Sequence, residues 1–272
     1  MKLSDFDIFD CFFSGGRDSA LTCYIAHKVA NALGKQFRLV HIDTKISIPD
    51  TREYVEKYAE WIGAELVVVT TKYDYFKSVK EWGYPSVIKN RWCWRYLKQE
   101  PLYEFRINEL REREREALWV LGIRRSESVF RLENYGKLKN TLTRAMIKNL
   151  HVTEWLPILY LSSKDIDILI NKFNIPKNPV WQKLGISGEC LCLAGTSKKT
   201  LEALFSQYPD IAEEFYQFDK SLVPKHNNSL IPLGLWNEKK RLYQFIEEVR
   251  KKKRQTKIDE YFACQGPCFY IK

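Results

Sequence analysis

The chain has 272 residues, of which 45% are hydrophobic, 14% aromatic and 29% charged. This composition is typical of a folded globular protein with one or two domains, and it excludes a disordered or fibrous one. Lysine and arginine number 44 against 34 aspartates and glutamates, giving a formal net charge of +10, which favours anionic ligands such as nucleotides or nucleic acid.

The sequence carries no apolar stretch close to the roughly 20 residues that a membrane-spanning helix needs. Its first residues contain two acids, Asp5 and Asp7, ahead of the first apolar run, and they lack the basic start and cleavage site of a signal peptide. We therefore expect a cytoplasmic protein without a membrane partner. Its seven cysteines, an odd number, argue in such a chain for core thiols mixed with metal-binding or redox thiols.

Short apolar runs alternate with amphipathic stretches in the first part of the chain, the pattern of a parallel sheet flanked by helices. The expected strands are residues 6–13, 37–42, 65–70, 117–122 and 151–156. The expected helices are residues 18–33, 49–62, 72–82, 92–110 and 162–173, with Ser163 as the N-cap of the last. We therefore predict an α/β fold with a Rossmann-like parallel sheet.

The alternation stops beyond Gly195, and the remaining sequence is typical of helices. We therefore divide the chain into an α/β domain, residues 1–195, and a helical basic region, residues 196–272. Between residues 238 and 257, nine lysines or arginines stand against three acids, so six of the ten net charges lie there. The same segment has an apolar face that packs, and its basic face is either a solvated helix surface or a nucleic-acid contact.

The most informative segment is FFSGGRDSA, Phe12 to Ala20, between the first strand and the first helix. Ser14, Gly15 and Gly16 allow a sharp turn in which backbone amides approach an anion, and the helix starting near Asp18 points its positive end there. The spacing of its glycines differs from that in the phosphate loop of P-loop NTPases and from that in the GxGxxG motif of dinucleotide-binding folds. The segment predicts a phosphate-binding loop; the alternative is an ordinary strand-to-helix turn.

With this loop the sequence resembles the adenine nucleotide alpha hydrolase-like superfamily, whose loop is SGGxDS, and within it the phosphoadenosine phosphosulfate (PAPS) reductase family. Further segments that match in the same order are residues 41–66, 90–102, 122–131 and 164–192. The resemblance covers about residues 8–195 and implies that residues 1–195 are a nucleotide-binding domain. Two features depart from the family: Arg17 stands where it usually has lysine, and the Glu-Cys-Gly motif of the reductases is absent.

The resemblance also implies a set of site residues. Those expected to bind the nucleotide are Ser14, Gly15, Gly16, Arg17, Asp18, Ser19, Asp43, Thr44, Gly122, Arg125 and Glu127. Those expected to act in catalysis are Asp18, Arg124 and Arg131. The two arginines are included because guanidinium groups bind phosphate or sulfate oxygens bidentately. Arg125 is alternatively a solvated surface residue, and Glu127 either holds an arginine or joins Asp18 in binding Mg²⁺.

The cysteines divide into core and candidate metal-binding positions. Cys11 and Cys23 lie in apolar surroundings and are expected to be buried small hydrophobes. In the cluster-containing branch of the family, Cys93, Cys190 and Cys192 match ligands of a [4Fe-4S] cluster, with Cys264 or Cys268 as a fourth. The alternatives are a zinc site made of Cys190, Cys192, Cys264 and Cys268, or redox and buried thiols.

Three functions remain open at this point. The first is reduction of a sulfonucleotide, PAPS or adenosine phosphosulfate (APS), to sulfite with a thioredoxin-like donor. The second is splitting of ATP with Mg²⁺ by an ATP-pyrophosphatase-type enzyme that adenylates a substrate for sulfur transfer to nucleic acid. The third is a non-catalytic nucleotide sensor. A homodimer is a further expected assembly.

Overall fold

The computed structural model describes residues 1–86, 91–112, 117–222 and 241–265. The chain divides into two compact units, the first made of residues 1–74 and 92–191 and the second of residues 75–91 and 192–272. The expected domain boundary at residue 195 lies close to the return to the second unit at Cys192. Nothing in the sequence indicated that residues 75–91 belong with the C-terminal region.

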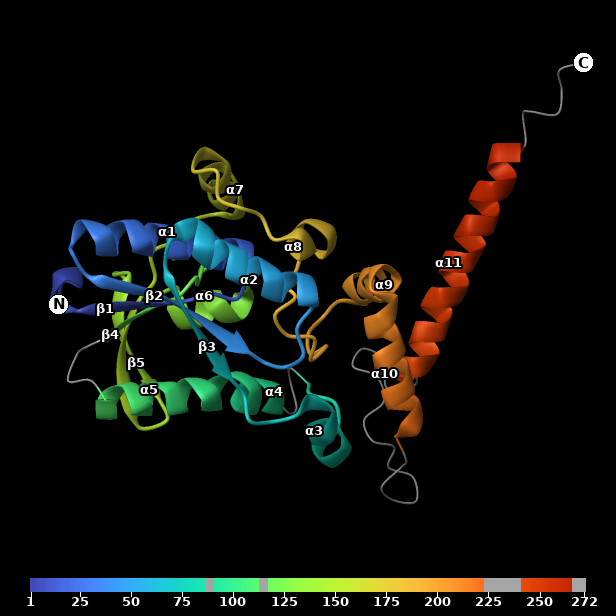
Figure 1. Cartoon of the computed structure of the whole chain (residues 1–272), viewed down its shortest axis with the longest axis horizontal. Helices are drawn as coiled ribbons and strands as arrows, with labels where there is room; N and C mark the ends of the chain where they lie inside the picture. The colour runs from blue at the N-terminus through green and yellow to red at the C-terminus, as the bar shows by residue number, and fades with distance from the viewer. Residues whose placement is uncertain (87–90, 113–116, 223–240, 266–272) are drawn as a thin grey trace, which may run out of the picture. The chain divides into compact units, whose positions relative to one another are not determined.

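The first unit is built on a six-stranded sheet with the order β3-β2-β1-β4-β6-β5 (Figure 1). The strands are β1 (Ile8–Phe12), β2 (Gln36–Asp43), β3 (Glu65–Thr70), β4 (Ala117–Val120), β5 (Leu142–Ile147) and β6 (Leu150–Trp155). Neighbouring strands pair in parallel except β5 and β6, which form an antiparallel pair at one edge. The predicted Rossmann-like α/β fold is therefore confirmed.

The strand order reverses between β1 and β4. From β1 the chain proceeds outward through β2 to β3, and it then returns to the other side of β1 with β4. In open α/β sheets the connections at such a switch point diverge and leave a crevice at the carboxyl ends of the strands. The predicted phosphate loop follows β1, and the matched segment 122–131, called here the second arginine motif, follows β4. The fold therefore brings both to this crevice.

Helices cover both faces of the sheet (Figure 1). They are α1 (Arg17–Ala32), α2 (Pro49–Ile62), α4 (Trp92–Trp94), α5 (Glu100–Glu112), α6 (Val129–Tyr135), α7 (Ser163–Lys172) and α8 (Pro179–Leu184). The larger core lies between the sheet and α1 and α2, with Ile166 and Ile170 of α7 packed into it. On the other face Leu102 of α5 meets Trp119 and Val152.

A buried ion network ties the centre of the sheet to α5. Arg38 on β2 is 2% exposed, and its guanidinium donates to both carboxylate oxygens of Asp10 on β1 at 2.8 and 2.9 Å. The same group donates to both oxygens of Glu109 at 3.2 and 2.9 Å. Each charge in this apolar layer therefore has a partner, as burial requires.

The second unit is helical in its described part and contains α3 (Tyr75–Trp82), α9 (Lys198–Gln207), α10 (Pro209–Ser221) and α11 (Leu242–Gln265). The rings of Phe205, Phe215 and Phe245 bring α9, α10 and α11 together at centroid distances of 6.0 and 6.3 Å. The expected apolar face of α11 is buried at Leu242, Phe245, Ile246 and Val249. The prediction of a mainly helical C-terminal region is confirmed.

The basic segment of α11 is partly engaged within this unit. Arg250 pairs with Glu213 at 2.6 Å and Lys252 with Glu202 at 2.9 Å. Lys253 donates to the carbonyl oxygen of Ser206 at 2.6 Å. These side chains hold α11 against α9 and α10. Of the other basic positions in this segment, residues 239 and 240 and the side chain at position 257 lie outside the described part of the chain.

The structure differs from the sequence prediction in several local features. The helix expected over residues 92–110 contains a π-helical stretch, Arg95–Gln99, between α4 and α5. The N-cap of α7 is Ser162, whose hydroxyl accepts from the Asp165 amide, and not Ser163, whose side chain contacts arginines instead. The edge strand β5 was not predicted, because its sequence LTRAMI interrupts the apolar run with an arginine. Helices α6 and α8, of 7 and 6 residues, are too short to produce a clear periodicity.

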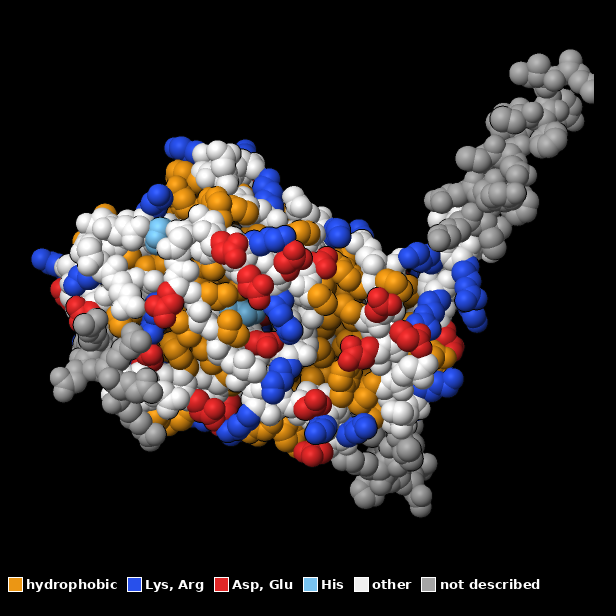
Figure 2. Space-filling model, in the orientation of Figure 1, with side chains coloured by type: hydrophobic (Ala, Val, Ile, Leu, Met, Phe, Trp, Pro, Cys, Tyr) orange, Lys and Arg blue, Asp and Glu red, His pale blue; other side chains and the backbone are white. Residues whose placement is uncertain are grey.

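No helix in the described part of the chain has both the length and the apolar character needed to cross a membrane. On the face of the first unit drawn in Figure 2, acidic and basic side chains are interspersed. The net positive charge is therefore not gathered into one basic surface on that face.

Candidate active site

The phosphate loop turns between β1 and α1 at the switch point. Gly15 has a φ of +73°, and a Cβ there would lie 3.0 Å from the Thr51 Cγ2 atom, so both backbone conformation and space require glycine. Gly16 is the N-cap of α1, and no side chain caps this helix. The amides of its first turn are therefore left to bind an anion, which the helix dipole favours.

The two serines of the loop brace it from within. The Ser14 hydroxyl lies 3.1 Å from that of Ser19 and accepts from the Gly16 amide at 3.3 Å. Ser19 in turn donates to the carbonyl oxygen of Gly16 at 2.9 Å. The loop is thus preorganised before any ligand arrives.

A second brace comes from the segment around α8. The Asn178 amide donates to the carbonyl oxygens of Gly15 at 2.8 Å and Ser187 at 3.1 Å. Thr51 of α2 donates to the same Ser187 carbonyl at 2.6 Å. Asn178 and Thr51 lie in segments that match the family, residues 164–192 and 41–66, but their loop-holding roles were not predicted.

The carboxylate of Asp18 is held by two arginines. Its Oδ2 accepts from Arg124 Nε at 2.6 Å and its Oδ1 from Arg17 Nε at 3.2 Å. The Arg124 side chain is 6% exposed and also donates through Nη1 to Ser126 and Ser163. Its Nη2 has no hydrogen-bond partner in the described part of the chain, so one donor of a fixed guanidinium remains for a ligand.

Gly122 explains how β4 reaches α1 so closely. A Cβ at this position would lie 3.0 Å from Ser19 Cα and 3.1 Å from Ser19 N. Only glycine leaves room for the backbone after β4 to touch the first turn of α1. The two motifs that the sequence singled out therefore form one site.

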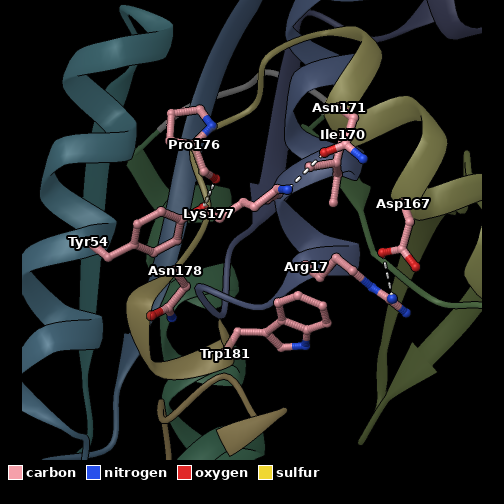
Figure 3. Close-up of a pocket in the computed structure, with 10 residues that line it drawn as sticks. Arg17, Tyr54, Asp167, Ile170, Asn171, Pro176, Lys177, Asn178 and Trp181 are labelled. Carbon is pink, nitrogen blue, oxygen red and sulfur yellow. Dashed lines mark hydrogen bonds and ion pairs between the residues drawn. The ribbon is translucent and has the colours of Figure 1, made fainter. Parts of the chain in front are cut away.

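Arg17 extends toward α7 and α8 and shares the Ser163 hydroxyl with Arg124. Its Nη1 donates to Asp167 at 2.8 Å and its Nη2 to Ser163 at 3.3 Å, while its guanidinium lies 5.0 Å from the centre of the Trp181 ring (Figure 3). Asp167, Ser163 and Trp181 were not among the predicted site residues, although Asp167 and Trp181 lie in the matched segment 164–192.

Asp43 and Thr44 lie at the carboxyl end of β2, as predicted. Asp43 accepts from the backbone amide of Lys45 at 2.9 Å and from Arg52 at 3.2 Å. The Thr44 hydroxyl is buried and donates to the carbonyl oxygen of Glu189 at 2.8 Å. The hydroxyl of Thr44 thus ties the strand end to the segment before Cys190.

The remaining predicted residues after β4 form contacts of their own. Arg125 is exposed and stacks on Tyr160, with its guanidinium 4.8 Å from the ring centre. Arg131 pairs with Glu127 at 3.5 Å. Nearby Glu154 is buried, and burial raises its pKa to about 7 although Arg131 acts in the opposite direction.

Cys11 and Cys23 are buried core residues with their sulfur atoms 2.8 Å apart, as expected for structural thiols. Burial raises the pKa of the Cys11 thiol, which keeps it neutral.

The candidate metal ligands are distributed over both units. Cys93 and Cys190 belong to the first and Cys192 to the second, and the side chains of Cys264 and Cys268 lie outside the described part. Among the described residues, no group of three or more His, Cys, Asp or Glu side chains is placed to hold a metal ion. In that part of the chain, Cys93, Cys190 and Cys192 therefore do not form a metal-binding group.

Together, a parallel sheet with a switch point and an anion-binding loop define an α/β protein of the nucleotide-binding class. Residues 10–191 match the family model described as the phosphoadenosine phosphosulfate reductase domain. The chain belongs to this family, as its loop and second arginine motif predicted.

Two curated relatives come from Methanocaldococcus jannaschii. The uncharacterized protein MJ0066 is 29% identical over 84% of this chain and 45% of its own length. The uncharacterized protein MJ0973 is 30% identical over 53% of this chain and 32% of its own length. The chain therefore spans less than half the length of either relative.

Two solved structures are similar to the chain at low identity. The PAPS reductase of Candida auris, in a phosphate complex, is 15% identical with a TM-score of 0.46, covering 65% of this chain and 77% of that one. The U34-tRNA thiolase NcsA of Methanococcus maripaludis, with its [4Fe-4S] cluster, is 14% identical with a TM-score of 0.45, covering 89% of this chain and 80% of that one.

Proposed function

We propose that the protein is an enzyme that binds a sulfonucleotide, APS or PAPS, on the phosphate loop and cleaves it reductively to sulfite. The loop amides and Arg124 hold the phosphate that becomes the leaving group. A thiolate attacks the sulfonate sulfur, the bond from sulfur to the bridging oxygen breaks, and the nucleotide leaves with the electron pair. A second thiol then releases sulfite and leaves a disulfide.

The proposal rests on one observation: the two carboxylates expected to bind Mg²⁺, those of Asp18 and Glu127, are already paired with arginines. Both oxygens of Asp18 accept from arginines, and Glu127 pairs with Arg131. Mg²⁺ usually reaches a protein-bound nucleotide through one or two carboxylates. A sulfonucleotide would instead be held by the loop amides and by Arg124 Nη2, which need no divalent cation.

The source of the thiol and the presence of a metal belong to the proposal as well. The attacking thiol is either Cys264 or Cys268 of this chain or a thioredoxin-like donor. A [4Fe-4S] cluster would be held by Cys93, Cys190 and Cys192, with Cys264 or Cys268 as the candidate fourth ligand. We assign no step to a metal, and iron and zinc analysis of anaerobically purified protein measures which is bound.

The test is turnover with three nucleotides. Sulfite release from APS or PAPS with dithiothreitol or reduced thioredoxin in EDTA is the expected result, abolished in Arg124→Ala and kept in Arg144→Ala, which changes an exposed arginine on β5. Pyrophosphate release from ATP with Mg²⁺ would instead support the adenylating enzyme for sulfur transfer to nucleic acid. Binding without turnover would support a sensor.

A further inference from the structure

A separate pocket lies beside the phosphate loop within the first unit. It has a volume of about 260 Å³ and is bounded by α1, α2, α7 and the segment leading into α8 (Figure 3). Its lining residues are Arg17, Ala20, Tyr54, Asp167, Ile170, Asn171, Pro176, Lys177, Asn178 and Trp181. None of the residues predicted for the nucleotide lines it except Arg17.

The pocket combines an apolar interior with a polar rim. Ala20, Tyr54 and Ile170 are buried, whereas Asn171 and Lys177 are exposed at the rim. The hydroxyl of Tyr54 is occupied, because it donates to the carbonyl oxygen of Pro176 at 2.7 Å. A ligand in the interior would therefore contact ring faces and aliphatic surface, which suit a flat apolar group.

The charges at the rim favour a single negative charge on that ligand. Arg17 and Lys177 are cations and Asp167 is an anion, so the lining carries one excess positive charge. Arg17 is committed to Asp167, but Lys177 donates to Asn171 Oδ1, a neutral acceptor, at 2.8 Å. Lys177 has no acidic partner in the described part of the chain, so its ammonium group is left to bind an anion.

We propose that this pocket is a second ligand site, separate from the phosphate loop, that binds a planar aromatic ring carrying one anionic group. The ring lies against Trp181 and the aliphatic floor, and the anion pairs with Lys177. A volume of about 260 Å³ limits the ligand to roughly the size of a nucleoside monophosphate or a smaller aromatic acid. This inference does not depend on the reaction proposed above.

The pocket also touches the loop that holds the phosphate. Asn178 both lines the pocket and donates to the Gly15 carbonyl oxygen. Arg17 both lines the pocket and begins α1. A ligand in the pocket would therefore rest on residues that shape the loop without occupying the crevice between β1 and β4.

Calorimetric titration with indole-3-acetate, a planar aromatic monoanion, tests the proposal. We expect binding to the full chain, a loss of about tenfold in affinity in Lys177→Ala, and a larger loss in Trp181→Ala. Lys172→Ala, an exposed lysine on α7 outside the pocket, is the matched control and should bind like the parent. Lys177 is exposed, so its variant is expected to fold even if Trp181→Ala does not.

Two further arms separate the sites and the ligand sources. Gly16→Val, which should lose sulfonucleotide binding, should keep indole-3-acetate binding, and saturating PAPS should not displace the probe from the parent. If Gly16→Val binds AMP, the natural ligand of the pocket is a nucleotide that supplies both ring and anion. If Gly16→Val binds indole-3-acetate but not AMP, the natural ligand is an aromatic acid that is not a nucleotide. Displacement by PAPS, equal affinity in Lys177→Ala, or no binding of either probe would overturn the proposal.

Discussion

Arg124, from the segment after β4, donates through Nε to Asp18 Oδ2, in the first turn of α1, across 2.6 Å. The two residues are 106 positions apart in the sequence, and their pairing joins the phosphate loop to the second arginine motif. It also fixes a guanidinium that is 6% exposed, with Nη2 left for a ligand.

Replacing Arg124 by alanine should weaken sulfonucleotide binding by about 2–3 kcal/mol, because it removes a charge-assisted donor and leaves Asp18 as a repulsive carboxylate. Arg124→Lys should recover part of this loss, since it keeps the charge without the fork. Calorimetric titration with APS measures both. Arg144→Ala is the control, and an Arg124→Ala variant with parental affinity would remove Arg124 from the site.

Replacing Gly15 by alanine should cost ~1–2 kcal/mol of stability for the positive φ, with a further cost from contact with Thr51. It should also lower nucleotide affinity, because the loop has to shift. Gly34→Ala is the matched control: Gly34 has a φ of +64° with no atom within 4 Å of an added Cβ. Denaturant unfolding and APS titration should show a stability loss in both variants but an affinity loss only in Gly15→Ala.

Glu154 should make the folded state less stable as the pH rises. Burial raises its pKa from 4.5 to about 7, so between these values the folded state binds more protons than the unfolded state and the free energy of unfolding falls with increasing pH. Glu154→Gln should therefore be more stable than the parent at pH 8, by ~1–3 kcal/mol, and similar at pH 4.5. Urea midpoints of both proteins at the two pH values measure this stability difference. A difference that does not change with pH would contradict the raised pKa of Glu154.

Removing Arg38 should destabilise the first unit severely. Arg38→Met removes the guanidinium partner of the buried Asp10 carboxylate and of the part-buried Glu109 carboxylate, and breaking such a pair costs about 3–5 kcal/mol. Arg38→Met combined with Asp10→Leu and Glu109→Leu should regain much of the loss, because both carboxylates are then removed together with their partner. Thermal unfolding of the two variants tests this; a triple variant less stable than Arg38→Met would refute the explanation.

The sheet and the phosphate loop could be predicted from the sequence because their causes are local. Apolar runs alternate with amphipathic helices, Pro49 and Gly63 punctuate α2, and Gly15 with Gly16 marks the loop. Strand β5 could not be predicted from the sequence, because an edge strand needs no continuous apolar run and its pairing depends on a distant partner.

The partners of the site residues could not be predicted either. Nothing local to Asn178 indicates that it holds the Gly15 carbonyl, 163 residues away. Arg17 was expected to bind the nucleotide from its place in the loop, but the acceptor that orients it, Asp167, comes from α7. Sequence identifies residue chemistry at such positions, whereas orientation depends on tertiary contacts.

We propose above all that a sulfonucleotide binds on the loop between β1 and α1. Gly16 leaves little room there, since an added Cβ would lie 3.2 Å from Ser14 Oγ and 3.5 Å from Ser187 Cβ, and the branched side chain of valine would fill the space of the phosphate. The most direct measurement is calorimetric titration of the parent and Gly16→Val with PAPS and APS in EDTA. We predict binding by the parent and none by Gly16→Val; no binding by the parent, or equal affinity in the two proteins, would contradict the claim.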